Sequence, residues 1–386
     1  MQRIQIVLVF IGLLAFGFEA FGAEAKPNIN KLRAMYSNKD SSKWEKAHID
    51  ERILREIAKD LGLSNHTSKS NVAKIRAHIE LRALPLTPPY PESNPFSEEK
   101  RALGEKLFND PRLSKSEQIA CASCHDRYLA FGDGKPLSHG HNRQVGRRNA
   151  PNIMMSAFST ENFWDGRAKD LEAQSLFPIA DPKEMAYTAD KAAKKLNGIK
   201  EYKDDFEKAF GTRKITKELM AKAIATYERS LMPSQTRFDL FLNGESKRLS
   251  DKEVLGLHIY RTKAQCLNCH NGVALTDNKY YNLGLHNYGR EGEDLGRYEV
   301  TKDPLDMGKF KTPTLRRVAL SGPYFHNGSF RFLRMVLMHY NMGFFGGNPT
   351  PAQKDDPLFP KTDPLIRPLK LTAEEFEALE AFMNVL

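Results

Sequence analysis

The spacing of apolar residues predicts four main helices, arranged as two similar pairs. Residues 103–108 and 255–260 each begin Leu-Gly and place apolar side chains three to four positions apart, as on one face of an α-helix. Similar periodicity recurs at 217–231 and 372–386. This indicates an internal repeat of two mostly helical units, with a boundary near 233–249. Two of the helix starts carry capping boxes: Ser250 with Glu253, and Thr372 with Glu375.

The chain before this repeat has a different pattern. Residues 43–63 are highly charged and have helical spacing, which predicts one helix. Residues 84–95 are rich in proline, which predicts an extended segment. Both belong to an N-terminal extension, residues 26–95, to which the pattern assigns no role.

The first 25 residues have the pattern of a secretory signal peptide. Arg3 is followed by a mostly apolar stretch, residues 4–21, and by the small-x-small sequence Ala-Glu-Ala at 23–25. The alternative is an uncleaved membrane anchor, for which the apolar stretch is short. Cleavage near residue 25 is therefore expected, and no later stretch could cross a membrane. These features predict export to the periplasm and no stable membrane span after cleavage.

Composition and charge narrow the class of protein. Of the 386 residues, 40% are apolar and 27% are charged, as in ordinary globular proteins. The net charge of +10 does not indicate nucleic-acid binding, because the basic residues are spread along the chain. It predicts a basic surface, and steering of an acidic redox partner is the alternative use of that charge.

The cysteines supply the strongest chemical signal. All four belong to two Cys-x-x-Cys-His motifs, 121–125 and 266–270. In this pattern the two thiols bond covalently to the vinyl groups of one haem, and the adjacent histidine binds the iron. A thioredoxin-like pair does not need a following histidine, and zinc sites rarely repeat in this form. The motifs therefore predict two c-type haems, held by Cys121, Cys124 and His125 and by Cys266, Cys269 and His270.

With these motifs, the chain resembles the bacterial di-haem cytochrome c peroxidases and the related di-haem enzyme that matures methylamine dehydrogenase. The resemblance covers about residues 83–386. It implies a mostly α fold with two cytochrome c-like domains, a peroxidatic one at 96–240 and an electron-transfer one at 241–386. Besides the haem motifs it rests on five runs: Pro-Arg-Leu-Ser at 111–114, Arg-Asn-Ala-Pro at 148–151, Phe-Trp-Asp-Gly-Arg at 163–167, Lys-Thr-Pro-Thr-Leu-Arg at 311–316 and Gly-Pro-Tyr-Phe-His-Asn-Gly at 322–328.

The resemblance assigns four residues to the peroxide site of the first haem. His141, after Gly140, matches a distal histidine that binds the iron in the resting enzyme and leaves on activation. Glu184 matches a glutamate that transfers the peroxide proton, and Gln174 matches a glutamine of the same pocket. Trp164 matches an indole that carries electrons between the haems. Each of three residues also has a purely structural alternative: His141 as an exposed loop histidine, Glu184 as a helix-start carboxylate and Trp164 as a buried core tryptophan.

A calcium ion between the domains is also implied. Asn149 matches one ligand, and the backbone oxygens of Ser321 and Pro323 match two more. Amide and carbonyl oxygens are the hard ligands that calcium takes. The family usually has threonine at the position of Ser321, but only the backbone oxygen is used.

The second haem departs from the peroxidase pattern. The peroxidases have a methionine ligand seventeen residues after the proline of the 322–328 run, and this count from Pro323 ends on Tyr340. The methylamine dehydrogenase-maturing enzyme has tyrosine there. An anionic oxygen ligand should lower the iron potential. Met338 and Met342 remain alternative ligands if the loop shifts by two residues.

These features predict an enzyme that reduces hydrogen peroxide with electrons from a small cytochrome c or cupredoxin. The long loops after each haem motif favour an enzyme. One alternative is oxidation of a protein or small organic substrate through high-valent iron, which Tyr340 supports and His141 opposes. The other is a plain di-haem electron carrier, which Glu184 and Gln174 oppose. A homodimer is compatible with the resemblance.

Overall fold

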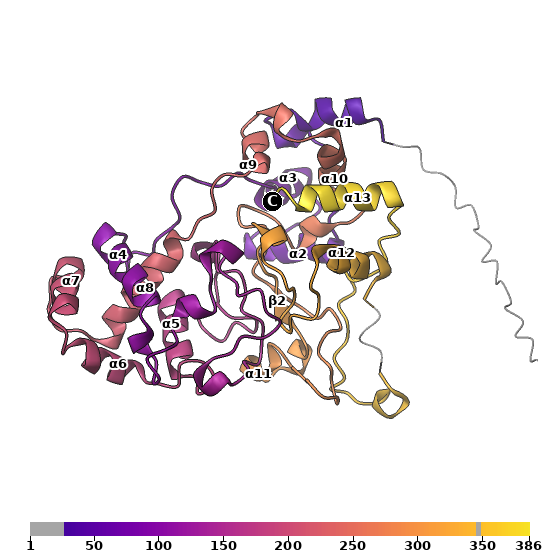
Figure 1. Cartoon of the computed structure of the whole chain (residues 1–386). Helices are drawn as coiled ribbons and strands as arrows, with labels where there is room; N and C mark the ends of the chain where they lie inside the picture. Colours follow the sequence, from indigo (N-terminus) through magenta and orange to yellow (C-terminus); the bar gives the residue numbers. More distant parts are fainter. Residues whose placement is uncertain (1–26, 345–348) are drawn as a thin grey trace, which may run out of the picture.

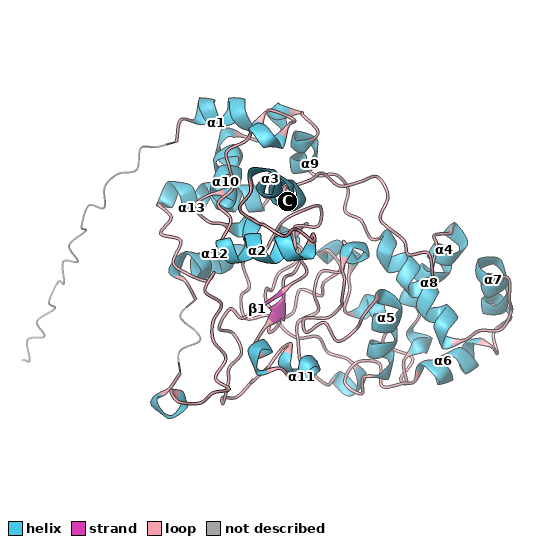
Figure 2. Ribbon diagram, turned by 180° about the vertical axis from the view of Figure 1, so that it is seen from behind, coloured by secondary structure: helices cyan, strands magenta, loops and turns pink. Residues whose placement is uncertain are grey.

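The computed structural model describes residues 27–344 and 349–386, and the predicted signal peptide lies outside them. The described part is mostly helical, as expected, with one antiparallel pair of two-residue strands, β1 (Tyr280–Tyr281) and β2 (Phe310–Lys311) (Figures 1 and 2). None of its helices combines the length and the apolar character that crossing a bilayer requires. The α-helices are α1 Ile29–Tyr36, α2 Glu51–Asp60, α3 Lys69–Ile79, α4 Glu98–Phe108, α5 Leu171–Ala180, α6 Ala189–Leu196, α7 Lys200–Phe210, α8 Lys217–Ser230, α9 Arg237–Leu242, α10 Asp251–Arg261, α11 Tyr298–Thr301, α12 Leu333–Met342 and α13 Ala373–Met383.

The predicted repeat appears as two closely crossed helix pairs. Helix α4 packs against α8, and α10 packs against α13. A Cβ atom at Gly104 would lie 2.0 Å from the carbonyl oxygen of Ala223, and one at Gly256 would lie 2.0 Å from that of Ala378. The two Leu-Gly positions are therefore glycine for the same reason, because the partner backbone occupies the space of a side chain.

The starts of α10 and α13 carry the two predicted capping boxes. Ser250 accepts from the backbone of Glu253, whose side chain in turn accepts from the backbone of Ser250. The same reciprocal box joins Thr372 and Glu375 at the start of α13. These side chains satisfy amide groups that have no partner within the helix, so both starts are specified locally.

Two separate apolar cores follow the two pairs. The first contains residues of α4, α6, α7 and α8 and ends at Leu231. The second core contains residues of α9, α10, α12 and α13. The first of its residues after Leu231 in the chain is Phe238. The change from one core to the other therefore falls between Leu231 and Phe238.

The N-terminal segment belongs to the second core. Buried apolar residues of α1, α2 and α3 pack there, and α1 lies against α10 (Figure 1). The buried guanidinium of Arg261 binds the carbonyl oxygen of Glu45 and lies 5.1 Å from the centre of the Trp44 ring. The segment thus completes the core of the C-terminal half.

The single helix predicted for residues 43–63 is wrong in its first part. Helix α2 begins only at Glu51, with the Asp50 side chain as its cap. Before it, the backbone N–H of His48 donates to the Arg261 carbonyl and that of Asp50 donates to Asn268 Oδ1. Because tertiary partners take these backbone groups, local helical spacing does not decide the conformation here.

We expect Gly256→Ala to destabilise the protein by about 1–3 kcal/mol, because the new methyl group must push α10 away from α13. Urea unfolding of the haem-loaded protein would measure this loss. Gly146→Ala is a matched control, since its Cβ would meet no other atom closer than 3.5 Å. Equal stability of the two variants would contradict the close-crossing argument.

Candidate functional site

The two Cys-x-x-Cys-His motifs have the same local geometry. Each begins with one 3-10 turn, Cys121–Ser123 in the first and Cys266–Asn268 in the second. The backbone N–H of His125 donates to the Cys121 carbonyl at 3.1 Å, and that of His270 donates to the Cys266 carbonyl at 2.8 Å. All four cysteines are free thiols rather than disulfides. Both motifs thus present two thiols and one histidine from the same turn.

The two histidine rings are prepared to bind metal through Nε2. Nδ1 of His125 lies 2.7 Å from the Phe131 carbonyl, and Nδ1 of His270 lies 3.1 Å from the Leu275 carbonyl. A carbonyl only accepts, so Nδ1 carries the proton and Nε2 keeps its lone pair. Burial lowers the pKa of both rings, that of His270 to about 4, which keeps them neutral. The residues present therefore fit two covalently attached haems.

A cavity of about 450 Å³ lies beside the first motif. Residues from both halves of the chain line it, so it is formed only in the folded protein. The lining includes Cys121, Cys124, His125, Gly140, Asn162, Trp164, Gln174, Glu184, Lys311 and Pro313. The structure therefore brings Glu184, Gln174 and Trp164 together with the first motif.

Glu184 and Gln174 give the cavity its polar chemistry. Burial raises the pKa of the Glu184 carboxyl, with a further contribution from Asp181. Gln174 Oε1 is buried and has no partner among the described residues. A carboxyl group in such a poorly solvated position exchanges a proton more readily near neutral pH than a surface one.

The His141 loop packs directly against Glu184. The His141 backbone N–H donates to the Glu184 carbonyl at 2.7 Å. A Cβ at Gly140 would lie 2.2 Å from the Lys183 carbonyl oxygen, so only glycine allows this contact. Gly140 lines the cavity, whereas His141 is not among its lining residues, and its Nδ1 is buried without a partner. The loop is thus next to the cavity, with its histidine ring outside it in this conformation.

Trp164 is held from both halves of the chain. Its Nε1 donates to the Asn149 carbonyl at 3.0 Å, and its own carbonyl accepts from the Lys311 backbone N–H at 2.8 Å. Next to Lys311, the Thr312 carbonyl accepts a hydrogen bond at 2.7 Å from the Thr276 hydroxyl, in the loop that follows the second motif. The short segment 311–313 therefore connects Trp164 to the second haem motif.

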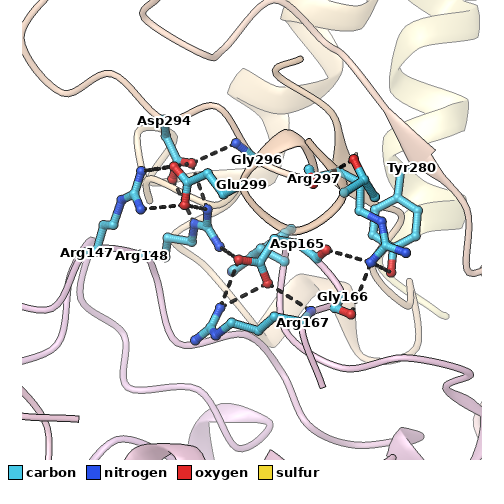
Figure 3. Close-up of polar contacts among 12 residues, drawn as sticks. Arg147, Arg148, Asp165, Gly166, Arg167, Tyr280, Asp294, Gly296, Arg297 and Glu299 are labelled. Atoms are coloured by element: carbon cyan, nitrogen blue, oxygen red, sulfur yellow. Dashed lines mark hydrogen bonds and ion pairs between the residues drawn. The ribbon is translucent and has the colours of Figure 1, made fainter. Parts of the chain in front are cut away.

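The loop that carries Trp164 is fastened by a charged network (Figure 3). Arg148 pairs with Asp165 of this loop and with Asp294 of the second half, and Arg297 donates to the backbone oxygens of Asp165 and Gly166. Carboxylate partners hold the pKa of Arg148 above its ordinary value, although burial alone would lower it. The sequence pattern alone gives these arginines no role. Their only mark in the sequence is that Arg148 belongs to the run 148–151 and its partner Asp165 to the run 163–167, both of which carry the family resemblance.

The predicted calcium ligands have free oxygens. Asn149 Nδ2 donates to the carbonyls of Lys135 and Pro136, which leaves Oδ1 for another partner. None of the hydrogen bonds among the described residues ends on the carbonyl oxygens of Ser321 or Pro323. Amide and carbonyl oxygens of this kind are the ligands that a hard cation takes.

Helix α12 separates the candidate ligands of the second haem. Met338 and Met342 are four residues apart, share one face and are 46% and 40% exposed. Tyr340 is offset from both by two residues, so it lies on the opposite side of the helix and packs against the second core. Burial raises the pKa of its hydroxyl above the ordinary value, and Cys269 and Cys266 contribute. Of the three candidate ligands, Tyr340 is therefore the side chain that faces the second motif.

Known proteins match this chain over most of its length. Residues 98–247 match the family described as di-haem cytochrome c peroxidase. The chain is 39% identical to a cytochrome c551 peroxidase of Nitrosomonas europaea over 61% of this chain and 70% of the relative. It is 32% identical to the methylamine utilization protein MauG of Methylorubrum extorquens over 83% of this chain and 86% of the relative.

A solved structure agrees with these matches. It is a MauG-like protein associated with microbial copper homeostasis, with a TM-score of 0.69, 32% identity and coverage of 78% of this chain and 94% of that one. The matched sequences and the two haem-attachment motifs together show the family of this chain. This chain belongs to the di-haem cytochrome c peroxidase family, which includes MauG, and is an oxidoreductase.

Proposed function

We propose that this protein reduces hydrogen peroxide to water at a haem attached to Cys121 and Cys124. A small cytochrome c or cupredoxin would supply the electrons through a second haem on Cys266 and Cys269. The observation that carries the proposal is Glu184, a carboxyl with a raised pKa in the same cavity as the first motif. A plain electron carrier does not need such a group.

The side chains of the cavity have distinct tasks in this proposal. Bound haem supplies the iron that holds peroxide and exchanges single electrons. Glu184 takes the proton from the inner peroxide oxygen and returns it to the outer one, which leaves as water when the O–O bond breaks. Two electrons and two protons complete the conversion to a second water. Gln174, with its unpartnered Oε1, orients the peroxide beside Glu184.

Three further assignments belong to the same proposal. Trp164 carries electrons between the haems, supported by its contacts with Asn149 and Lys311. His141 binds the iron in the resting enzyme and leaves on activation, supported by the position of its loop beside Glu184. Calcium bound by Asn149, Ser321 and Pro323 holds the two halves together.

The organisation of the chain is part of the proposal. Residues 96–240 and 241–386 form two cytochrome c-like domains, supported by the two crossed helix pairs and the two cores. Residues 1–25 direct export and are removed, so that the haems are attached in the periplasm.

Oxidation of a protein or small organic substrate is the second candidate. The observation that favours it is Tyr340, which faces the second motif in place of the methionine of the peroxidases. A phenolate ligand stabilises ferric iron, so the second haem would be harder to reduce by a donor. The similarity to MauG supports the same reading.

The first test is haem content. We expect two haems per chain by pyridine haemochrome assay and intact mass, together with loss of about the first 25 residues. Replacing both Cys266 and Cys269 by alanine should leave one haem, because the first motif is complete without them. A wild-type chain with one haem or none would contradict the assignment.

The second test concerns proton transfer. Glu184→Gln should keep both haems but lower peroxide turnover by roughly two to four orders of magnitude, the usual contribution of a positioned acid–base group. Steady-state peroxide consumption measures this. Glu201→Gln is the control, since its exposed carboxylate binds only Lys106 on the surface. Unchanged turnover in Glu184→Gln would remove this residue from the mechanism.

The third test concerns the second haem. Tyr340→Met should raise its potential and introduce the weak near-infrared absorption of a histidine–methionine ferric haem, because a thioether replaces an anionic oxygen. Met338→Leu should leave the spectrum unchanged. If the unmodified protein already shows that absorption and Met338→Leu removes it, Met338 is the ligand and Tyr340 is not.

A further inference from the structure

Lys311 is a cationic side chain in the cavity without a counter-ion. It lines the cavity beside the first haem motif, and its backbone N–H is bonded to Trp164. None of the hydrogen bonds or ion pairs among the described residues involves its Nζ. Burial lowers the pKa of this amine to about 8, which reflects the cost of a charge removed from water. A poorly solvated ammonium of this kind normally has an anionic partner.

The two carboxylates that act electrostatically on Lys311, those of Glu161 and Asp277, have other partners. Glu161 accepts from the Tyr280 hydroxyl at 2.7 Å and pairs with Arg297 at 3.1 Å. Asp277 accepts from the Tyr281 hydroxyl at 2.7 Å and from the Lys279 backbone N–H at 2.9 Å. Both act on Lys311 only at longer range. Among the described residues, neither of these two carboxylates is therefore free to pair with this amine.

A second unpartnered donor lines the same cavity. Asn162 is only 8% exposed, and its Nδ2 is buried without a hydrogen-bond acceptor. Its backbone N–H is already bonded to the Ala168 carbonyl at 2.8 Å. An ammonium and an amide N–H are both donors, and together they suit a carboxylate, which only accepts.

We propose that Lys311 and Asn162 bind a propionate carboxylate of the haem attached at Cys121 and Cys124. This inference rests on the first haem of the proposed function. The propionates are the anionic groups that a haem brings into the cavity, and the cavity with these two donors is the one that contains both cysteines.

The arrangement would couple the first haem to the second half of the chain. Lys311 lies in β2, and its backbone already bonds to Trp164. A carboxylate on its ammonium would therefore place the first haem, Trp164 and the 311–313 segment in one bonded unit. A positive charge near the haem also favours ferrous over ferric iron, so Lys311 would raise the potential of the first haem.

Lys311→Met tests the proposal through the haem potential. We expect the midpoint potential of the first haem to fall by an amount equal to roughly a tenfold change in the ferric-to-ferrous ratio, about 59 mV for one electron. Lys311→Arg should restore most of the wild-type value. Lys309→Met is the matched control, because this lysine lies two residues away and pairs with Asp306. Spectroelectrochemical titration of the holoprotein measures all three variants.

Asn162, the second donor, is tested by its own variant. Asn162→Leu should lower the same potential by a smaller amount. Equal potentials in Lys311→Met and Lys309→Met would overturn the proposal, as would a haem-loaded crystal structure in which Lys311 Nζ contacts no propionate. If Lys311→Met does not fold, Lys311→Gln replaces it. Haem content is measured first, so a missing first haem would refute the proposed function rather than the role of Lys311.

Discussion

The ion pairs of Arg148 hold the centre of this molecule together. Its guanidinium, in a side chain only 9% exposed, joins Asp165 of the first half to Asp294 of the second. Removing one partner from such a buried group leaves an uncompensated charge, which typically costs about 3–5 kcal/mol. Asp165 directly follows Trp164, the Arg148 guanidinium lies 5.6 Å from the ring centre of Phe310 in β2, and Arg148 itself lines the cavity. The relative positions of the Trp164 loop, β2 and the cavity wall therefore depend on these ion pairs more than on the helices, which pack within their own halves.

Because the helices pack within their own halves, two similar units can carry different residues around their haem motifs. The crossed helix pairs, with glycine at each closest approach, provide the same support to both haem motifs. The differences come from residues outside the crossed pairs: Glu184 and Gln174 border the first motif, whereas Tyr340 on α12 faces the second. The proposed chemistry at the first site and the proposed ligand at the second are thus additions to one repeated scaffold.

The N-terminal segment shows where the local sequence pattern stops predicting the backbone conformation. Its charged, helix-like spacing is real, but residues before Glu51 give their backbone bonds to Arg261 and Asn268 of the second half. Charge and spacing along the chain do not encode such partners. In contrast, the starts of α10 and α13 follow the sequence closely, because their caps are made by residues only three positions away.

The sequence by itself determined the mostly helical class, the repeat, the two haem-attachment motifs and the family, since each depends on residues close together in the chain. It also named Glu184, Gln174 and Trp164, which the structure places in one cavity. It left Tyr340, Met338 and Met342 as alternatives, because counting residues does not say which side of a helix faces inward. Only the tertiary structure decided that Tyr340 faces the second motif, and only it revealed the unpaired Lys311. Both depend on contacts between segments far apart in the chain, which local spacing cannot specify.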